Sequence, residues 1–395
     1  MSIVTISHST AQAAAHPGRP ASANATVPKI VQTSPHTLSQ NRVRSGLRAV
    51  VGSLPVRIGI TTPPFNVLFG SDVLHRAPPG SIGLHREGKR TVLPDADELP
   101  EVLLDLAVPH EDINELVRLR RELTRDPDAT RLLEECVGEL VKDIGEHGHW
   151  THLTELLLAR LPEAPPGIGA HFPVYVFVAA LPFTRAYHRE RGIPADVSRR
   201  TLADLGRNIA VHHRRFGGAG LPFPQWLVPH FRGELYQLGR LQFERARLGE
   251  RTAQALTAAG LDAGPDTPCL NLHIPDYSGP LTPAACDRSL ELARAFFARH
   301  FPEEHHEVAT CHSWLLDPQL KRYLSADSNI VRFQDRFRVI REDTEPADTE
   351  PVQFVFGHPD QAVESLPRRS SVERAVGDHL RAGGHWYLGH GWFPL

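Results

Sequence analysis

Cysteine is scarce in this sequence, and its spacing excludes two common roles. The chain has four cysteines among 395 residues, at Cys136, Cys269, Cys286 and Cys311. None belongs to a CxxC pair, so the spacing favours neither a cysteine zinc site nor a disulfide framework. Reduced thiols are typical of the cytosol, and we therefore expect a cytoplasmic protein.

A long apolar segment and an excess of one charge are also missing. The longest apolar runs, such as 172–183, are short and broken by proline, so we expect no membrane partner. The formal net charge is −3, which provides no basic field for a nucleic acid partner. Residues 1–44 lack the pattern of a secretory signal and a core-forming composition, and we expect a disordered tail there.

Helical periodicity dominates the first part of the chain. Apolar residues recur at spacings of four, three and four at Leu133, Val137, Leu140 and Ile144. Residues 172–187 predict a buried helix and residues 197–212 an amphipathic one, whereas 234–245 predict a strand. We therefore expect a mostly helical N-terminal domain over 45–260.

The period becomes alternating after a Gly/Pro/Asp-rich linker at 260–268, which predicts a C-terminal domain over 268–395. Leu270, Leu272 and Ile274 face one side of a strand, and Asn271 and His273 the other. Later patterns predict a helix capped by Thr282 with Pro283 at its first position, then a strand at 308–316 and a helix around 330–337. They further predict a strand at 352–356, a helix opened by a Ser370/Glu373 capping box, and a strand at 385–393. This order favours α/β layers, so the whole chain is expected to be α+β.

Three segments carry a family resemblance: LNLHIP…GPLT from Leu270, CHSWLLDP from Cys311 and SNIVRFQDRF from Ser328. They resemble a bacterial group of GNAT-like N-acyltransferases that combine a helical N-terminal domain with a GNAT-like C-terminal domain. The resemblance implies acyl-CoA as co-substrate. It also implies a mixed sheet in which the strand at 268–274 carries the pantetheine arm and the following strand diverges to open a thioester slot.

The same resemblance names the residues expected to contact acyl-CoA. These are Leu272 and Ile274 on the strand, Ser278, Gly279 and Thr282 in the phosphate loop and at the helix start, and Asn329 and Arg332 on a later helix. Two positions depart from the family pattern. The loop Asp276–Pro280 has a single glycine, and Gln334 stands where the family often has a tyrosine that protonates the thiolate.

Two histidines are the candidate catalytic residues. His273 ends the first strand beside the expected acyl slot, and a histidine titrates in the range that a general base requires. His312 lies within the next strand and is a candidate base or acceptor-positioning residue. For both, the alternative is a packed structural histidine. Cys311 precedes His312 on a strand, so the two point to opposite faces and we expect Cys311 in the core.

These residues predict an acyltransferase that moves an acyl group from acyl-CoA, or from a carrier thioester, directly to an amine or hydroxyl of a small-molecule acceptor. One alternative is a GNAT-like module that binds acyl-CoA without turnover. Another is a metal hydrolase built on His147, His149 and His152, although no HExxH motif is present and we expect no metal. The sequence leaves the oligomeric state open.

Overall fold

A computed structural model describes residues 93–142, 144–146, 160, 164, 167–221, 224–340, 345–358 and 361–395. These residues all fall within one compact unit. The expected tail at 1–44 and the cluster of His147, His149 and His152 lie outside the described residues.

The N-terminal part is helical, as the periodicity predicts. Helix α3 begins after Asp126, whose carboxylate accepts hydrogen bonds from the backbone N–H groups of Asp128 and Ala129. Its predicted face of Leu133, Val137 and Leu140 is buried, and the helix ends before Ile144. The helices are α1 (Leu99–Asp105), α2 (His110–Arg125), α3 (Pro127–Val141), α5 (Phe172–Glu190), α6 (Ala195–Leu202), α7 (Asp204–Phe216) and α8 (Val228–Phe231), with 3₁₀ turns η2 (Gly169–His171) and η3 (Pro224–Leu227).

Helix α5 forms the centre of this helical core, and its buried character confirms the prediction for 172–187. The single helix predicted over 197–212 is instead two helices, α6 and α7, which meet at Ala203. The first residue of α7, Asp204, is buried at this junction. Within the described part of the chain, no helix combines the length and apolarity needed to cross a bilayer.

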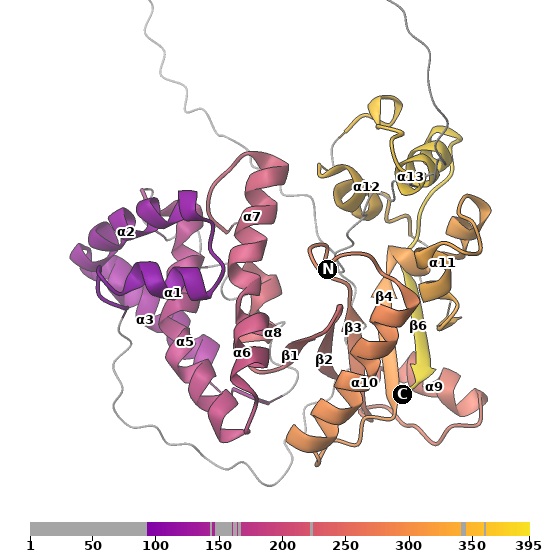
Figure 1. The fold of residues 1–395 in the computed structure, drawn as a ribbon, viewed down its shortest axis with the longest axis horizontal. Helices are drawn as coiled ribbons and strands as arrows, with labels where there is room; N and C mark the ends of the chain where they lie inside the picture. Colours follow the sequence, from indigo (N-terminus) through magenta and orange to yellow (C-terminus); the bar gives the residue numbers. More distant parts are fainter. Residues whose placement is uncertain are drawn as a thin grey trace, which may run out of the picture. The chain divides into compact units, whose positions relative to one another are not determined.

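The C-terminal part contains a six-stranded mixed sheet with the order β1-β2-β3-β4-β6-β5. Figure 1 labels all of these strands except β5. Strands β3 and β4 are parallel, and the other neighbouring pairs are antiparallel. This architecture confirms the expected α+β class. The strands are β1 (Leu235–Leu238), β2 (Leu241–Arg247), β3 (Pro268–His273), β4 (Val308–Ser313), β5 (Arg338–Ile340) and β6 (Gly389–Pro394).

The strand predicted over 234–245 is wrong as a single element, because the segment folds into the β1–β2 hairpin. Gly239 turns the chain with a φ of 72°, a conformation that side-chain-bearing residues rarely adopt. Strand β2 pairs with β3 along its length, so the sheet begins before the 260–268 linker. Helix α9 (Glu250–Ala258) and that linker connect the two strands.

The local cap signals of the C-terminal part are confirmed. Thr282 caps helix α10 (Pro283–His300), and Ser370 and Glu373 form a capping box at helix α13 (Ser371–Arg381). The strand predicted over 352–356 is wrong: this segment lies in helix α12 (Thr349–Phe356), which Gly357 closes in the left-handed conformation. The remaining elements are 3₁₀ turns η4 (Trp314–Leu316), η5 (Pro318–Arg322) and η6 (Val363–Ser365), and helix α11 (Asn329–Gln334).

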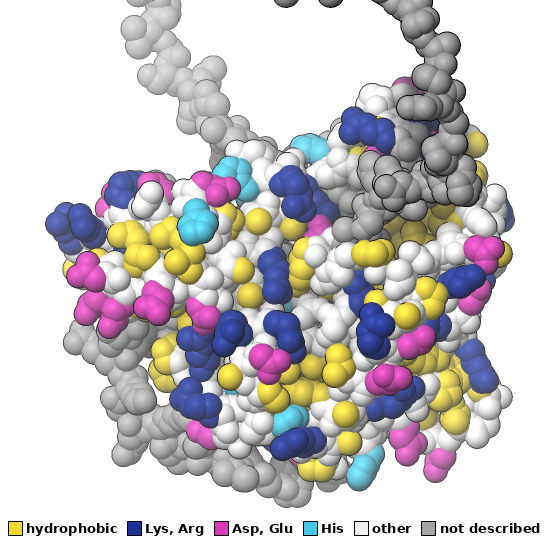
Figure 2. All heavy atoms as spheres, in the orientation of Figure 1, with side chains coloured by type: hydrophobic (Ala, Val, Ile, Leu, Met, Phe, Trp, Pro, Cys, Tyr) yellow, Lys and Arg dark blue, Asp and Glu magenta, His cyan; other side chains and the backbone are white. Residues whose placement is uncertain are grey.

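The two faces of the sheet differ in chemistry. Helix α10 covers one face and packs its apolar residues against Leu270, Leu272 and Ile274, so this half of the predicted strand pattern is confirmed (Figure 1). The opposite face carries polar residues at its centre and a smaller apolar cluster with α9. On the outer surface drawn in Figure 2, Lys and Arg are interspersed with Asp and Glu.

Candidate active site

Polar side chains cross the sheet face that α10 leaves uncovered. The strand registers align them: Gln242 lies opposite Gln237 and His273, and Asn271 lies opposite Glu244 and Thr310. Paired residues on neighbouring strands project from the same face. We use the name polar stripe for Gln237, Gln242, Glu244, Asn271, His273 and Thr310.

Strands β3 and β4 separate at the polar stripe. Their parallel pairing ends with Asn271 and Thr310. Strand β3 nevertheless continues to His273, and β4 continues to Ser313. The backbone groups of the two strands no longer meet beyond the last pair, which is the arrangement that the family resemblance implies for a thioester slot.

His273 and Glu244 form a buried pair within the stripe. His273 Nε2 lies 2.7 Å from Glu244 Oε2, and the same oxygen accepts a hydrogen bond from Asn271 Nδ2 at 3.0 Å. Burial lowers the pKa of His273 and outweighs the opposing effect of Glu244. Burial also opposes ionisation of Glu244, but the hydrogen bonds from His273 and Asn271 hold the pKa of this carboxyl below its usual value. The pair is therefore a neutral imidazole that donates Nε2–H to a carboxylate, and Nδ1 keeps its lone pair.

The N-terminal helices bring a second buried pair to the same face. Asp204 Oδ2 lies 3.0 Å from His230 Nε2 and accepts hydrogen bonds from Trp226 Nε1 and Asn208 Nδ2, each at 3.1 Å. The other carboxylate oxygen accepts a hydrogen bond from the Tyr277 hydroxyl. Burial opposes ionisation of Asp204, yet His230, Tyr277 and Arg207 keep its pKa below the usual value.

The two histidines differ in how their second ring nitrogen is used. His230 Nδ1 lies 3.0 Å from the backbone oxygen of Trp226, so both nitrogens of His230 face acceptors. A proton acceptor needs a free lone pair, and His273 Nδ1 meets that requirement better. The Trp226 indole packs edge-on against the His273 ring, with centroids 4.9 Å apart.

His312 occupies the next position along the same face of β4. It is half-buried, and its ring lies 5.9 Å from that of His390, the residue opposite it on β6. His390 in turn lies 3.0 Å from the Thr252 hydroxyl on α9. The structure thus places His273 and His312 on neighbouring strands that diverge between them, as the sequence predicts.

The expected phosphate loop leads into the first turn of α10. Gly279 adopts a φ of 78°, and the Thr282 hydroxyl accepts a hydrogen bond from the backbone N–H of Ala285. The side chains of Leu272 and Ile274 are buried under α10, which leaves only the backbone of these residues to contact a ligand. The roles expected for Leu272, Ile274, Ser278, Gly279 and Thr282 stay predictions.

The residues expected on α11 have partners within the protein. Arg332 is exposed and forms an ion pair with Asp327 at 2.7 Å, and Asn329 is the first residue of the helix. Gln334 is buried, and its amide donates hydrogen bonds to the backbone oxygens of Leu315 and Asp317. Gln334 thus holds the chain after β4, and the roles expected for Asn329 and Arg332 stay predictions.

The four cysteines are buried, and none of them is in a disulfide. Cys311 lies in the core on the α10 side of β4, so it faces away from His312. Burial raises the pKa of Cys311 to about 12, which keeps it protonated and a poor nucleophile at neutral pH. Within the described ranges, no group of three or more His, Cys, Asp or Glu side chains is placed to hold a metal ion.

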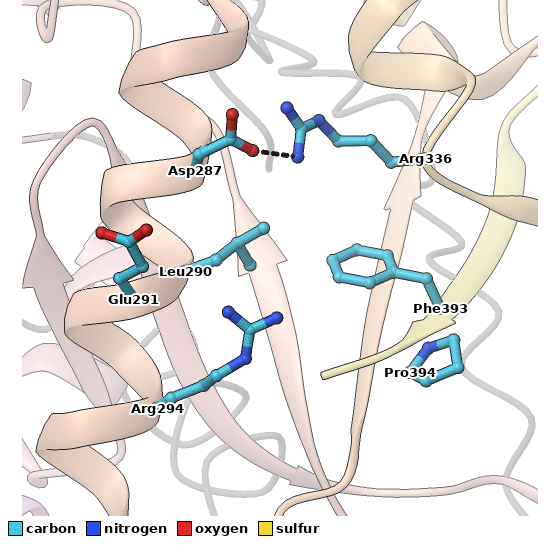
Figure 3. A pocket seen from close by; sticks show the side chains of 7 residues that line it. All are labelled: Asp287, Leu290, Glu291, Arg294, Arg336, Phe393 and Pro394. Atoms are coloured by element: carbon cyan, nitrogen blue, oxygen red, sulfur yellow. Dashed lines mark hydrogen bonds and ion pairs between the residues drawn. The ribbon is translucent and has the colours of Figure 1, made fainter.

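An open pocket of about 470 Å³ lies between α10 and the end of β6 (Figure 3). The ion pair between Asp287 and Arg336 spans one end of it. Since α10 covers the face opposite the polar stripe, this pocket is separate from the His273 site. Its lining residues are Asp287, Leu290, Glu291, Arg294, Arg336, Phe393 and Pro394.

Comparison with known families accounts for both parts of the chain. Residues 97–233 match the N-acyltransferase N-terminal domain, and residues 235–393 match the GNAT-like C-terminal domain. The chain belongs to this family of N-acyltransferases. The two matches meet at Glu234, so β1, β2 and α9 fall within the C-terminal match although they precede the 260–268 linker. No curated protein matched the sequence.

Solved structures give the same family assignment. An acyltransferase in complex with decanoyl-CoA and teicoplanin is 39% identical, with a TM-score of 0.66 over 77% of this chain and 90% of that chain. A mutant acyltransferase in complex with octanoyl-CoA is 38% identical, with the same TM-score and coverage. A complex with decanoyl-CoA is 36% identical, with a TM-score of 0.65 over 78% of this chain and 90% of that one. The protein is an acyl-CoA-dependent N-acyltransferase.

Proposed function

We propose that this N-acyltransferase transfers a medium-length acyl group from acyl-CoA to an amine of a teicoplanin-class glycopeptide. The observation that carries this proposal is the 39% identity over 90% of an acyltransferase solved with decanoyl-CoA and teicoplanin. Octanoyl-CoA in a further related structure supports the same range of chain length.

In the proposed reaction, the acceptor amine attacks the thioester carbonyl carbon. A C–N bond forms, the C–S bond breaks, and CoA leaves as a thiolate that takes up a proton. His273 is the general base: its Nδ1 removes the proton from the attacking amine, while Glu244 fixes the ring through Nε2. The neutral state of His273 supports this role, because only the unprotonated ring accepts a proton.

The polar stripe and the N-terminal helices supply the walls of this proposed site. Trp226, which lies against the His273 ring, comes from the N-terminal match, and His273 comes from the C-terminal match. We assign acyl-CoA to the region where the pairing of β3 and β4 ends and to the start of α10. His312, on the second of these strands, is assigned to positioning the acceptor.

The proposal is tested by incubating the protein with decanoyl-CoA and a teicoplanin-class glycopeptide that carries a free amine. Mass spectrometry is expected to show one added decanoyl group, and release of free thiol is expected to match it mole for mole. The control acceptor has its amine blocked by acetylation. CoA release without acylation of the glycopeptide, or acylation of the blocked acceptor, would overturn the acceptor assignment.

A further inference from the structure

Arg240 lies at the tip of the β1–β2 hairpin, where the hairpin packs against α10. Its backbone N–H donates a hydrogen bond to Ser289 Oγ on α10 at 2.7 Å. The neighbouring Gly239 is so close to the helix that a Cβ there would lie 2.7 Å from the same oxygen. The hairpin tip is therefore fixed on α10, and the side chain of Arg240 is only 5% exposed.

The guanidinium group of Arg240 has no hydrogen-bond partner in the described part of the chain. This holds for Nε, Nη1 and Nη2 alike. Two other buried arginines show the usual arrangement: Arg232 pairs with Glu234 at 2.8 Å, and Arg245 pairs with Glu304. A buried cation without an anion is costly, so its retention indicates a partner beyond the described residues, and a bound anion meets this need.

The surroundings of Arg240 identify the region that this cation faces. Burial lowers the pKa of Arg240 to about 10, against the opposing electrostatic effect of Cys286 in the first turns of α10 and of Tyr277 and Asp276 in the loop after β3. The Asp276 carboxylate is already engaged by Arg215 at 3.1 Å and Arg214 at 3.6 Å. Two arginines thus already pair with this carboxylate, and Arg240 adds a third positive charge that has no pair among the described residues, beside the N-terminus of α10. Such a site favours an anion.

We propose that Arg240 binds the pyrophosphate of acyl-CoA and that this contact lets the protein distinguish CoA thioesters from uncharged pantetheine thioesters. The proposal rests on the use of acyl-CoA and not on the identity of the acceptor. It also explains how CoA binds although the phosphate loop is poor in glycine: Gly279 is the single glycine between Asp276 and Pro280. An arginine from a neighbouring hairpin takes over the binding that several loop amides would otherwise provide.

Calorimetric titration with CoA alone tests the contact without any acceptor. A charge-assisted hydrogen bond is worth enough that Arg240→Gln is expected to weaken CoA binding by about 10- to 100-fold. Arg240→Lys keeps the charge but loses the planar fork, so a smaller loss is expected. The control is Arg131→Gln, an exposed arginine on α3 that pairs with Asp128. Equal affinities for the Gln variant and the unaltered protein would overturn the proposal.

Kinetic measurements with thioester analogues separate recognition from structural damage. Arg240→Gln is expected to raise KM for octanoyl-CoA and octanoyl-dephospho-CoA, both of which contain the pyrophosphate, and to leave kcat/KM for octanoyl-pantetheine unchanged. A loss confined to octanoyl-CoA would assign the contact to the 3′-phosphate and overturn the pyrophosphate assignment. An equal loss with octanoyl-pantetheine would show that Arg240 only supports the fold.

The ligand-free protein provides an independent readout. Because the buried guanidinium is unpaired, Arg240→Met is expected to raise the Tm of the protein without CoA. The same variant is expected to gain less Tm than the unaltered protein when CoA is added, because it binds CoA more weakly. A lower Tm without CoA, together with an undiminished gain on adding CoA, would contradict the proposal.

Discussion

At the scale of single residues, the proposed chemistry depends on the difference between His273 and His230. Both are buried and both contact a carboxylate. His230 uses its second nitrogen against a backbone oxygen, whereas the second nitrogen of His273 keeps its lone pair. Burial and hydrogen-bond geometry, and not residue type alone, therefore favour His273 over His230 as the proposed base.

Replacement of His273 by alanine is expected to lower kcat by about 100-fold or more, because a positioned general base contributes roughly this much. KM for octanoyl-CoA is expected to change little, since the base contacts the acceptor amine. Steady-state thiol release measures both constants. The matched control is His385→Gln, an exposed histidine that also pairs with a carboxylate, Asp348, at 2.7 Å. An unchanged kcat in His273→Ala would remove this residue from the mechanism.

The pH dependence of the reaction gives a second test of the pair. Since the pKa of His273 is lowered, the base stays unprotonated at neutral pH, and kcat/KM is expected to fall only when the pH drops below the usual histidine value of 6.5. Glu244 acts in the opposite direction and raises this pKa. Glu244→Gln is therefore expected to move the acidic limb of the pH–rate profile to lower pH and to reduce kcat. A limb that moves to higher pH would contradict the assigned pair.

The sequence predicts His273 as a site residue but does not reveal the side chains around it. The alternation of Leu270 and Leu272 with Asn271 and His273 carried the prediction, because the period of a strand separates its two faces. Glu244 was missed because the segment around it was interpreted as a single strand without the hairpin turn. Asp204, Trp226 and His230 come from helices far away in sequence, and no local spacing brings them to His273.

At the scale of elements, local signals were reliable where they involve caps and turns. Thr282 with Pro283, and Ser370 with Glu373, mark helix starts because their side chains bind backbone N–H groups within a few residues. The apolar run at 352–356 was misleading, since a short run fits a strand or a helix equally well. Gly357 beyond it was the available signal, because a glycine in the left-handed conformation often closes a helix.

The contact between α5 and α6 contains a buried histidine that links stability to pH. His188 Nδ1 lies 2.7 Å from Ser198 Oγ, and burial lowers the pKa of His188 to about 4. As the pH falls from about 6.5 toward 4, the unfolded chain binds a proton at this residue before the folded chain does, so stability is lost in that window. The expected loss between pH 7 and pH 5 is about 2 kcal/mol.

Urea unfolding at several pH values measures this loss. His188→Gln keeps an amide that can bond Ser198 but cannot titrate, so its free energy of unfolding is expected to depend less on pH between 7 and 5. Gln254→Asn, at an exposed position on α9 without a titratable side chain, is expected to leave the pH dependence unchanged. An equal slope in His188→Gln and the unaltered protein would show that His188 is not the group responsible.

At the scale of the whole molecule, the parts that match two different family domains share one buried polar network. Asp204 and His230 lie within the N-terminal match, and Tyr277, whose hydroxyl donates to Asp204, lies within the C-terminal match. Arg207 adds a second contact between the two matched regions: its guanidinium lies 4.6 Å from the centre of the Tyr277 ring. The two matched regions therefore depend on each other both for the site and for stability.

Tyr277→Phe tests this dependence. Loss of a hydrogen bond to a buried carboxylate is expected to cost about 1.5–3 kcal/mol of the free energy of unfolding, because Asp204 would keep one donor fewer. Urea unfolding followed by far-UV circular dichroism and by tryptophan fluorescence measures the loss. The two signals are expected to coincide in one transition, since the described residues form one compact unit.

Tyr323→Phe is the matched control. Its hydroxyl lies 2.9 Å from His379 Nδ1, but the residue is 40% exposed and within the C-terminal match, so a smaller cost is expected. Two separate transitions, or equal costs for the two variants, would show that the matched regions fold independently of the Asp204 network.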